Sequence, residues 1–226
     1  VNKIIQSKIK KVFFSIKDPD PRSYNRSKKK FKENNIYVKN NIRNSESNSF
    51  YRSYLKSKRK NLPFVTAKLA VSKDFFTVNK KKQWITNKYS RGRVHLLRSI
   101  HDALLTSSAT IIKDNPKLTC RIKGLEKTSP SRIILDKNLT IPIKSYVFLT
   151  AKKNRTIVFF IKNNLSKIKK MKKMGVKFIK MTPNSSNNFD LISVLRQIKL
   201  LGFSRIFLES GLKLTKAFLA NFLIDD

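Results

Sequence analysis

The segment from Leu104 to Arg121 (LLTSSATIIKDNPKLTCR) constrains the fold of this chain more than any other. Residues 103–106 form an apolar run long enough for a buried parallel strand. The small hydroxyl residues at 106–108 suit a turn and the N-cap of a helix. The helical turn predicted over 110–113 cannot continue far, because Asn115-Pro116 interrupts it. A polar loop directly after a strand is where open α/β sheets bind ligands, so this segment predicts both a fold class and a site.

Strands and helices alternate from residue 63 to the end of the chain. Continuous or alternating apolar residues predict strands, and apolar residues three or four apart predict helices. Thr86 is the predicted N-cap of the first of these helices, and Gly175 and Gly202 are predicted helix ends. The predicted strands cover 64–71, 103–106, 132–136, 146–150, 156–161, 176–181 and 205–208, and the predicted helices cover 88–100, 165–174, 190–201 and a last one with Leu214, Phe218 and Phe222. Short connections predict an α/β fold with a mostly parallel central sheet and helices on both faces.

Residues 1–60 form a less regular first part. It contains a strand predicted over 11–16, the turn Asp18-Pro19-Asp20-Pro21, a helix over 27–35 and a short strand over 36–38. We interpret residues 39–61 as a basic linker. A remnant of a larger folded domain and a disordered basic leader both fit this composition. We therefore expect two parts, residues 1–60 and residues 61–226.

The net charge is extreme, because 51 basic and 13 acidic residues give +38. One interpretation is a nucleic-acid-binding protein, since phosphates attract such a surface. The other is compositional drift toward Lys, Ile, Asn, Ser and Phe. We favour drift, because the basic residues are spread along the chain and form no single stripe.

Cysteine content and hydropathy exclude several classes of protein. Cys120 is the single cysteine, which rules out an internal disulfide and a CxxC zinc site and fits a reducing compartment. No apolar run approaches the roughly 18 residues that a membrane span needs, and the basic N-terminus has no apolar signal core. These features favour a cytoplasmic protein.

The turn Glu209-Ser210-Gly211 is a candidate phosphate site. It lies between a predicted strand and a predicted helix, where free backbone N–H groups at the helix start can bind an anion. Lys213 and Lys216 add positive charge beside it. The chain has no GxGxxG motif, so the pattern does not predict a Rossmann dinucleotide site.

Other candidate residues can be interpreted in two ways. Trp84 is either a core residue or one that contacts a ligand. Arg98 is either a solvated charge or an anion-binding residue one turn before a strand. His95 and His101 have no partner motif, and we interpret both as ordinary surface or half-buried residues.

Five ordered motifs resemble the pyrimidine reductase domain of the bifunctional deaminase–reductase of riboflavin biosynthesis. They are PFVTAKLA at 63–70 with Ser72 and Asp74, QWIT at 83–86, the segment at 104–121, RIILD at 132–136 and Glu209-Ser210-Gly211. The first part of the chain is similar to the end of the deaminase half, where a DPNP-type turn follows a strand. The resemblance implies a dihydrofolate-reductase-like fold. The zinc ligands and proton-shuttling glutamate of a deaminase have no counterpart here, so we predict no metal and no deaminase activity.

The resemblance also implies an activity and a set of contacts. The activity is NADPH-dependent reduction of 5-amino-6-(5-phosphoribosylamino)uracil to 5-amino-6-(5-phosphoribitylamino)uracil, with hydride passing from the nicotinamide to C1′ of the ribose. The implied NADPH contacts are Ala70, Trp84, Thr110, Asp114, Lys137, Gly211, Leu212, Lys213 and Leu214, and the implied substrate contacts are Lys82, Arg98, Leu118, Arg121 and Glu209. No residue is singled out as the catalytic proton donor. The implied partners are a separate deaminase that supplies the phosphorylated pyrimidine and a second copy of the chain in a homodimer.

The chain departs from the family pattern in several places. Phe75 and Ser210 stand where family members usually have glycine, and Lys82 stands where a serine is presented to the substrate. The chain ends at residues 223–226, where family members continue, so we expect the final strands to be missing and a sheet edge to be unpaired. These departures keep a second hypothesis open, in which the chain is a degenerate, non-catalytic remnant that acts as a basic nucleic-acid-binding protein.

Overall fold

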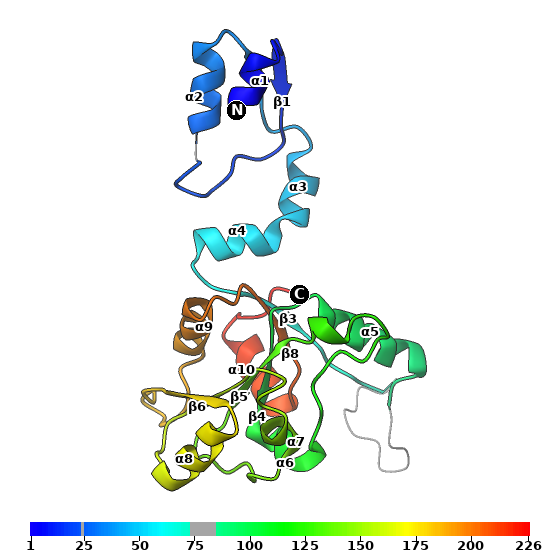
Figure 1. The fold of residues 1–226 in the computed structure, drawn as a ribbon, viewed down its shortest axis with the longest axis vertical. Coiled ribbons are helices and arrows are strands. Elements are labelled where there is room, and N and C mark those ends of the chain that lie inside the picture. Colours follow the sequence, from blue (N-terminus) through cyan, green and yellow to red (C-terminus); the bar gives the residue numbers. More distant parts are fainter. Residues whose placement is uncertain (24, 73–84) are drawn as a thin grey trace. The chain divides into compact units, whose positions relative to one another are not determined.

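The structure is a computed structural model that describes residues 1–23, 25–72 and 85–226. The chain forms two compact units, Val1–Leu62 and Pro63–Asp226 (Figure 1). Among the described residues, no helix combines the length and the apolar character that crossing a membrane would require.

The first unit is a small α/β arrangement. Its elements are α1 (Asn2–Gln6), β1 (Lys11–Phe13), α2 (Arg26–Glu33), β2 (Tyr37–Lys39), α3 (Asn44–Phe50) and α4 (Arg52–Arg59). β1 and β2 pair in parallel, with Val12 opposite Val38. Phe31, Ile36 and Leu55 are the buried apolar side chains among this unit's described residues.

Two helices, α3 and α4, occupy most of the segment 39–61 that we interpret as a linker. α4 is fixed to the aspartate–proline turn by its polar side chains. Lys58 Nζ donates to Asp20 Oδ2 at 2.7 Å, and Tyr54 Oη donates to Asp18 Oδ1 at 2.7 Å. Hydrogen bonds from Arg22 and Lys58 hold the pKa of Asp20 well below its usual range. The turn therefore depends on residues that sequence reasoning assigned to a linker.

The second unit is built on a six-stranded sheet. Its strands are β3 (Phe64–Ala67), β4 (Ala103–Ser107), β5 (Ser131–Leu135), β6 (Thr156–Phe160), β7 (Val176–Lys180) and β8 (Arg205–Leu208). Their order is β3-β8-β4-β5-β6-β7, and every described pairing is parallel. The predicted α/β fold with a mostly parallel sheet is confirmed.

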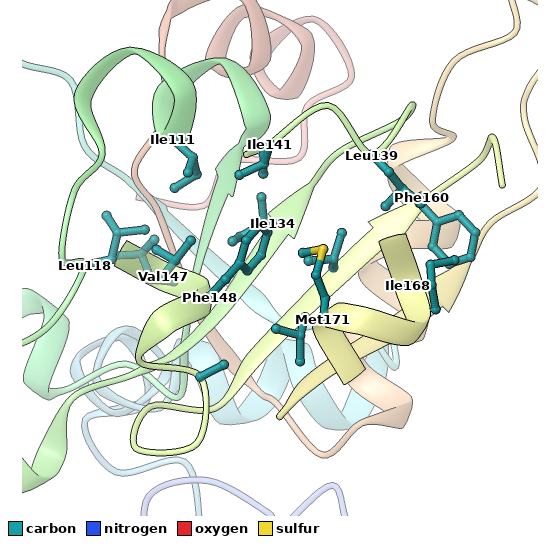
Figure 2. Packing of buried hydrophobic residues seen from close by; sticks show 14 of the residues in the cluster. Ile111, Leu118, Ile134, Leu139, Ile141, Val147, Phe148, Phe160, Ile168 and Met171 are labelled. Carbon is teal, nitrogen blue, oxygen red and sulfur yellow. The ribbon is translucent and has the colours of Figure 1, made fainter. Parts of the chain in front are cut away.

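Helices connect the strands and cover the sheet. They are α5 (Lys88–Ser99), α6 (Ser108–Asp114), the 3₁₀ turn η1 (Glu126–Thr128), α7 (Tyr146–Leu149), α8 (Leu165–Lys173), α9 (Leu191–Leu200) and α10 (Leu212–Ala220). On one face, side chains from α6, α7 and α8 pack over the sheet, as Ile111, Phe148 and Met171 do in Figure 2. Strand alternation sends Leu105 and Ile133 to the opposite face. The buried residues of α9 and α10 are not members of the cluster in Figure 2, which assigns these two helices to that opposite face.

Two local predictions were wrong. Residues 146–149 form helix α7 and not a strand, because short apolar runs do not distinguish a strand from a buried helix. Asn115 Oδ1 accepts a hydrogen bond from Tyr146 N at 2.8 Å and satisfies one of the free N–H groups at its start. The N-cap of α5 is Asn87 and not Thr86, since the Asn87 side chain accepts a hydrogen bond from Ser90 N at 2.9 Å.

We expect an unpaired sheet edge from the sequence, but the last residues of the chain bond to the outer edge of β3. Asp225 N donates to Val65 O at 2.9 Å, and Ala67 N donates to Asp226 O at 2.7 Å. The Asp225 carboxylate also accepts from Val65 N at 2.8 Å. This edge therefore has hydrogen-bond partners over most of its length.

Candidate functional site

The position of a site follows from the strand order. β4 and β8 are neighbours, and their connections leave the sheet toward opposite faces. α6 follows β4 and contributes Ile111 to the cluster in Figure 2, whereas α10 follows β8 and buries Phe218 outside that cluster. Where the connections after neighbouring strands turn to opposite faces, open α/β sheets bind ligands outside the carboxyl ends of those strands.

Arg98 and Glu209 form an ion pair at the carboxyl end of β8. Glu209 follows β8 directly and accepts two hydrogen bonds from Arg98 of α5, from Nε at 3.0 Å and from Nη2 at 2.8 Å. The side chains are only 9% and 18% exposed. Two parallel charge-assisted bonds in a half-buried place fix the plane of the guanidinium as well as its position. Two predicted substrate contacts that are far apart in the sequence are therefore one structural unit.

The segment after α6 adds a backbone acceptor to this unit. Leu118 and Cys120 are both 2% exposed, so they anchor the segment in the core. The residue between them, Thr119, directs its carbonyl oxygen at α5. That oxygen accepts from Arg98 Nη1 at 3.0 Å, and His95 Nδ1 lies 3.1 Å from it. The side chain of Leu118, predicted to contact substrate, is part of the hydrophobic core.

Arg121 joins the same network through His95. Arg121 Nη2 lies 3.1 Å from His95 Nε2, so the imidazole stands between the Thr119 carbonyl and an exposed guanidinium. Burial lowers the pKa of His95, and the positive charges of Arg98 and Arg121 lower it further. We interpreted His95 as an ordinary residue, but the structure gives it partners on both ring nitrogens. The spacing of His95 and Arg98 by three residues, on one face of a helix, was the available signal.

The start of α10 supplies backbone donors beside this network. Gly211 is the N-cap and has extended backbone, and no side chain caps the helix. A Cβ at Gly211 would meet nothing within 4 Å, so the backbone there faces open space. Leu212 and Lys213 of the first turn are exposed, and Ser210 Oγ lies 3.2 Å from Thr215 Oγ1. Uncapped N–H groups and a lysine in the first turn suit a phosphate group.

The other predicted NADPH contacts follow neighbouring strands. Thr110 and Asp114 are one turn apart on α6, and Thr110 Oγ1 lies 3.3 Å from Ser107 Oγ. Asp114 is exposed at the last position of that helix. Lys137 comes two residues after β5, and Ala70 is half-buried beyond β3. Because the strands are parallel, Thr110, Lys137 and Ala70 follow strand ends on the same edge of the sheet as Glu209, whereas Asp114 lies at the other end of α6.

Two of the predicted site residues lie outside the part of the chain that the structure describes. They are Trp84 and Lys82. Within residues 1–23, 25–72 and 85–226, no group of three or more His, Cys, Asp or Glu side chains could hold a metal ion. A hollow of about 1170 Å³ in the first unit is lined by Lys17, Arg52 and Arg59 among others, and none of the predicted site residues lines it. The candidate site is therefore built from the second unit.

Comparisons with known proteins connect this arrangement to a family. The sequence profile described as the RibD C-terminal domain matches residues 63–226. The riboflavin biosynthesis protein RibD of Chlamydia muridarum is 28% identical over 229 residues, covering 100% of this chain and 61% of that protein. The protein of the same name from Aquifex aeolicus is 31% identical over 224 residues, covering 98% of this chain and 61% of that protein.

A solved structure is similar over nearly the whole chain. It is a diaminohydroxyphosphoribosylaminopyrimidine deaminase/5-amino-6-(5-phosphoribosylamino)uracil reductase from Thermotoga maritima, with a TM-score of 0.78, 30% identity, and coverage of 97% of this chain and 59% of that one. The chain thus spans about three fifths of the length of the relatives that it matches. These similarities confirm the resemblance and the dihydrofolate-reductase-like fold that the motifs predicted.

Proposed function

The chain belongs to the RibD C-terminal domain family, and from that membership we propose that it is an NADPH-dependent reductase of riboflavin biosynthesis. The proposed reaction converts 5-amino-6-(5-phosphoribosylamino)uracil to 5-amino-6-(5-phosphoribitylamino)uracil. The observation that carries the proposal is the position of Glu209. It holds Arg98 through two hydrogen bonds and stands two residues before the uncapped start of α10. Two anion-binding elements therefore meet at one strand end, as a reaction between two phosphate-bearing molecules requires.

The chain has suitable residues for NADPH. The N–H groups of the first turn of α10, from Leu212 to Leu214, and the side chain of Lys213 would bind a phosphate of the cofactor. Thr110, Asp114, Lys137, Ala70 and Trp84 complete the proposed contacts. The bound nicotinamide supplies the hydride, and the protein orients it against the substrate.

The proposed substrate contacts are Arg98, Leu118, Arg121, Glu209 and Lys82. Arg98 makes three hydrogen bonds to described residues, so two of its five N–H groups remain to bind substrate oxygens. Arg121 is exposed beside it and carries a second positive charge. Guanidinium groups suit the phosphate of a sugar phosphate because they donate two parallel hydrogen bonds. Leu118 would contribute through its backbone, since its side chain is buried.

The proposal includes a cellular setting. The substrate is the product of a deaminase reaction, so we place a deaminase directly upstream in the pathway. We propose a cytoplasmic protein, and a homodimer as its assembly.

The experiment is a turnover assay with the purified chain, NADPH and enzymatically deaminated substrate. We expect loss of the absorbance of the reduced nicotinamide and formation of the ribityl product. Arg121→Met should raise the KM for the sugar phosphate, whereas Lys123→Met, which removes a charge two residues away, should not. Absence of turnover at every protein concentration would contradict the proposal. Tight RNA binding that weakens steeply with salt, without affinity for NADPH, would support the remnant hypothesis instead.

A further inference from the structure

We propose that His95 is a positioning residue that holds the guanidinium of Arg121 toward the substrate, and that only its neutral form with the proton on Nδ1 can do so. The inference rests on the proposed function, because it concerns how the sugar phosphate is bound. It adds a residue that none of the motifs assigned to the site.

The hydrogen-bond partners determine the tautomer. His95 Nδ1 lies 3.1 Å from the carbonyl oxygen of Thr119, which can only accept, so Nδ1 must carry a proton. His95 Nε2 lies 3.1 Å from Nη2 of Arg121, which can only donate, so Nε2 must be free of a proton. The imidazole is therefore neutral in this arrangement, and it accepts one hydrogen bond that fixes Arg121.

Arg121 needs this support because Arg98 already occupies the other acceptors of the network. Thr119 O already accepts from Arg98 Nη1, and Glu209 is occupied by two further bonds from Arg98. Arg121 is exposed, and the acceptor identified for it here is His95. A long exposed side chain loses much rotamer freedom when it binds a ligand, and a hydrogen bond that fixes it beforehand reduces that cost.

Protonation of His95 would reverse the effect. The charged groups that face the imidazole are Arg98 on its own helix, Arg121 on the segment after α6, and Glu209 after β8. A proton on Nε2 replaces the acceptor with a donor and places a positive charge against the Arg121 guanidinium. Burial and both arginines keep the pKa of His95 below its ordinary value, whereas Glu209 acts in the opposite direction. The arrangement therefore favours the neutral form near neutral pH, and Arg121 is released in acid.

Nuclear magnetic resonance of the imidazole nitrogens tests the geometry without any activity. The chain has two histidines, and His101 is a built-in control. Its Nδ1 lies 2.6 Å from Leu97 O, and its buried Nε2 has no partner among the described residues. We expect both histidines to carry the proton on Nδ1, and Arg121→Met to raise the pKa of His95 while leaving that of His101 unchanged. A proton on Nε2 of His95, or a pKa of His95 that is the same in Arg121→Met as in the parent chain, would overturn the inference.

Kinetics of the full chain test the function of the contact. His95→Ala and Arg121→Met should each raise the KM for the sugar phosphate about tenfold, or about 1.4 kcal/mol. The kcat should change little, and the double variant should be no worse than Arg121→Met alone. His95→Gln should restore much of the affinity, because its amide can donate to Thr119 O and accept from Arg121 but does not titrate. Leu96→Ala, an exposed neighbour on α5, is the matched control for a general effect on the helix.

The pH dependence separates positioning from a structural role. In the parent chain, the KM should rise as the pH falls through the pKa of His95, which lies below the ordinary histidine value of about 6.5. His95→Gln should lack the part of the rise that His95 causes and keep only the change due to the substrate phosphate, whose second pKa is about 6. His95→Ala should have a high KM at every pH. A parent profile without a rise, or an equal rise in His95→Gln, would refute the role of His95. Absence of turnover in every variant would contradict the proposed function, whereas the nuclear magnetic resonance result would still decide the contact.

Discussion

The hydrogen-bonded pair of Arg98 and Glu209 makes a quantitative prediction. Glu209→Gln keeps the shape of the side chain but removes its negative charge. The Arg98 side chain, which is only 9% exposed, then has no counter-ion at this position and keeps its hydrogen bond to Thr119 O. Exposed ion pairs contribute about 0–1 kcal/mol, and removing one partner of a fully buried pair costs about 3–5 kcal/mol. Because Glu209 is 18% exposed, this pair falls between the two cases. We expect Glu209→Gln to lower the free energy of unfolding by about 2–3 kcal/mol.

A double-mutant cycle measures the coupling. Urea unfolding followed by circular dichroism would be recorded for Glu209→Gln, Arg98→Met and the double variant. The double variant should cost at least about 1.5 kcal/mol less than the sum of the single variants, because each single variant leaves an unpaired charge. Glu126→Gln is the matched control, since Glu126 is exposed and a glutamine can keep its bond to Gly124 N. Additive single effects, or a cost of Glu209→Gln equal to that of the control, would refute this reasoning.

Three further predictions concern stability, and urea unfolding checks each of them. Arg132→Met should cost about 2–4 kcal/mol, because the buried guanidinium donates to the carbonyl oxygens of Val147 and Asn154 and to two threonine hydroxyls. Gly175→Ala should cost more than Gly202→Ala: both glycines have φ near +90°, but an added Cβ meets a neighbouring backbone nitrogen at 3.2 Å only at Gly175. Burial lowers the pKa of both histidines, so the unfolded chain binds more protons below about pH 6.5. The urea midpoint should therefore be constant above that pH and fall as the pH drops through the window below it.

Sequence periodicity predicted the sheet well because central strands such as β4 and β6 are buried on both faces. Continuous apolar runs such as 103–106 and 156–161 became central strands in the predicted order along the chain. The same rule failed at 146–150, where the apolar run belongs to a helix on the sheet face. The difference is set by tertiary partners, since Asn115 and Arg132 bond to the backbone of that helix. A local pattern does not contain partners that lie about 15 or 30 positions away.

The site was predictable as a set of residues but not as a network. Arg98 and Glu209 were each identified through a motif, yet their pairing joins residues 111 positions apart. The function of Thr119 lies in its carbonyl oxygen, which sequence reasoning cannot distinguish from any other. His95 was assigned no function because its partners are that carbonyl and the side chain of Arg121. Only its spacing of three residues from Arg98 hinted that the two share a helix face.

Buried Arg132 connects the hydrogen-bond network of Arg98, Thr119 and His95 to the core of the second unit. The RIILD motif predicts a strand from its apolar residues, and the arginine at its start is fully buried. Burial lowers the pKa of Arg132 to about 10, which still leaves it charged at neutral pH. Its Nη1 donates to Lys117 O at 3.4 Å, directly before the segment that carries Leu118, Thr119 and Arg121. The same guanidinium also donates to Val147 O in α7, so Arg132→Met should displace the Thr119 carbonyl. Because His95 Nδ1 lies 3.1 Å from that carbonyl, the chemical shift of its imidazole nitrogen should change even in protein that remains folded.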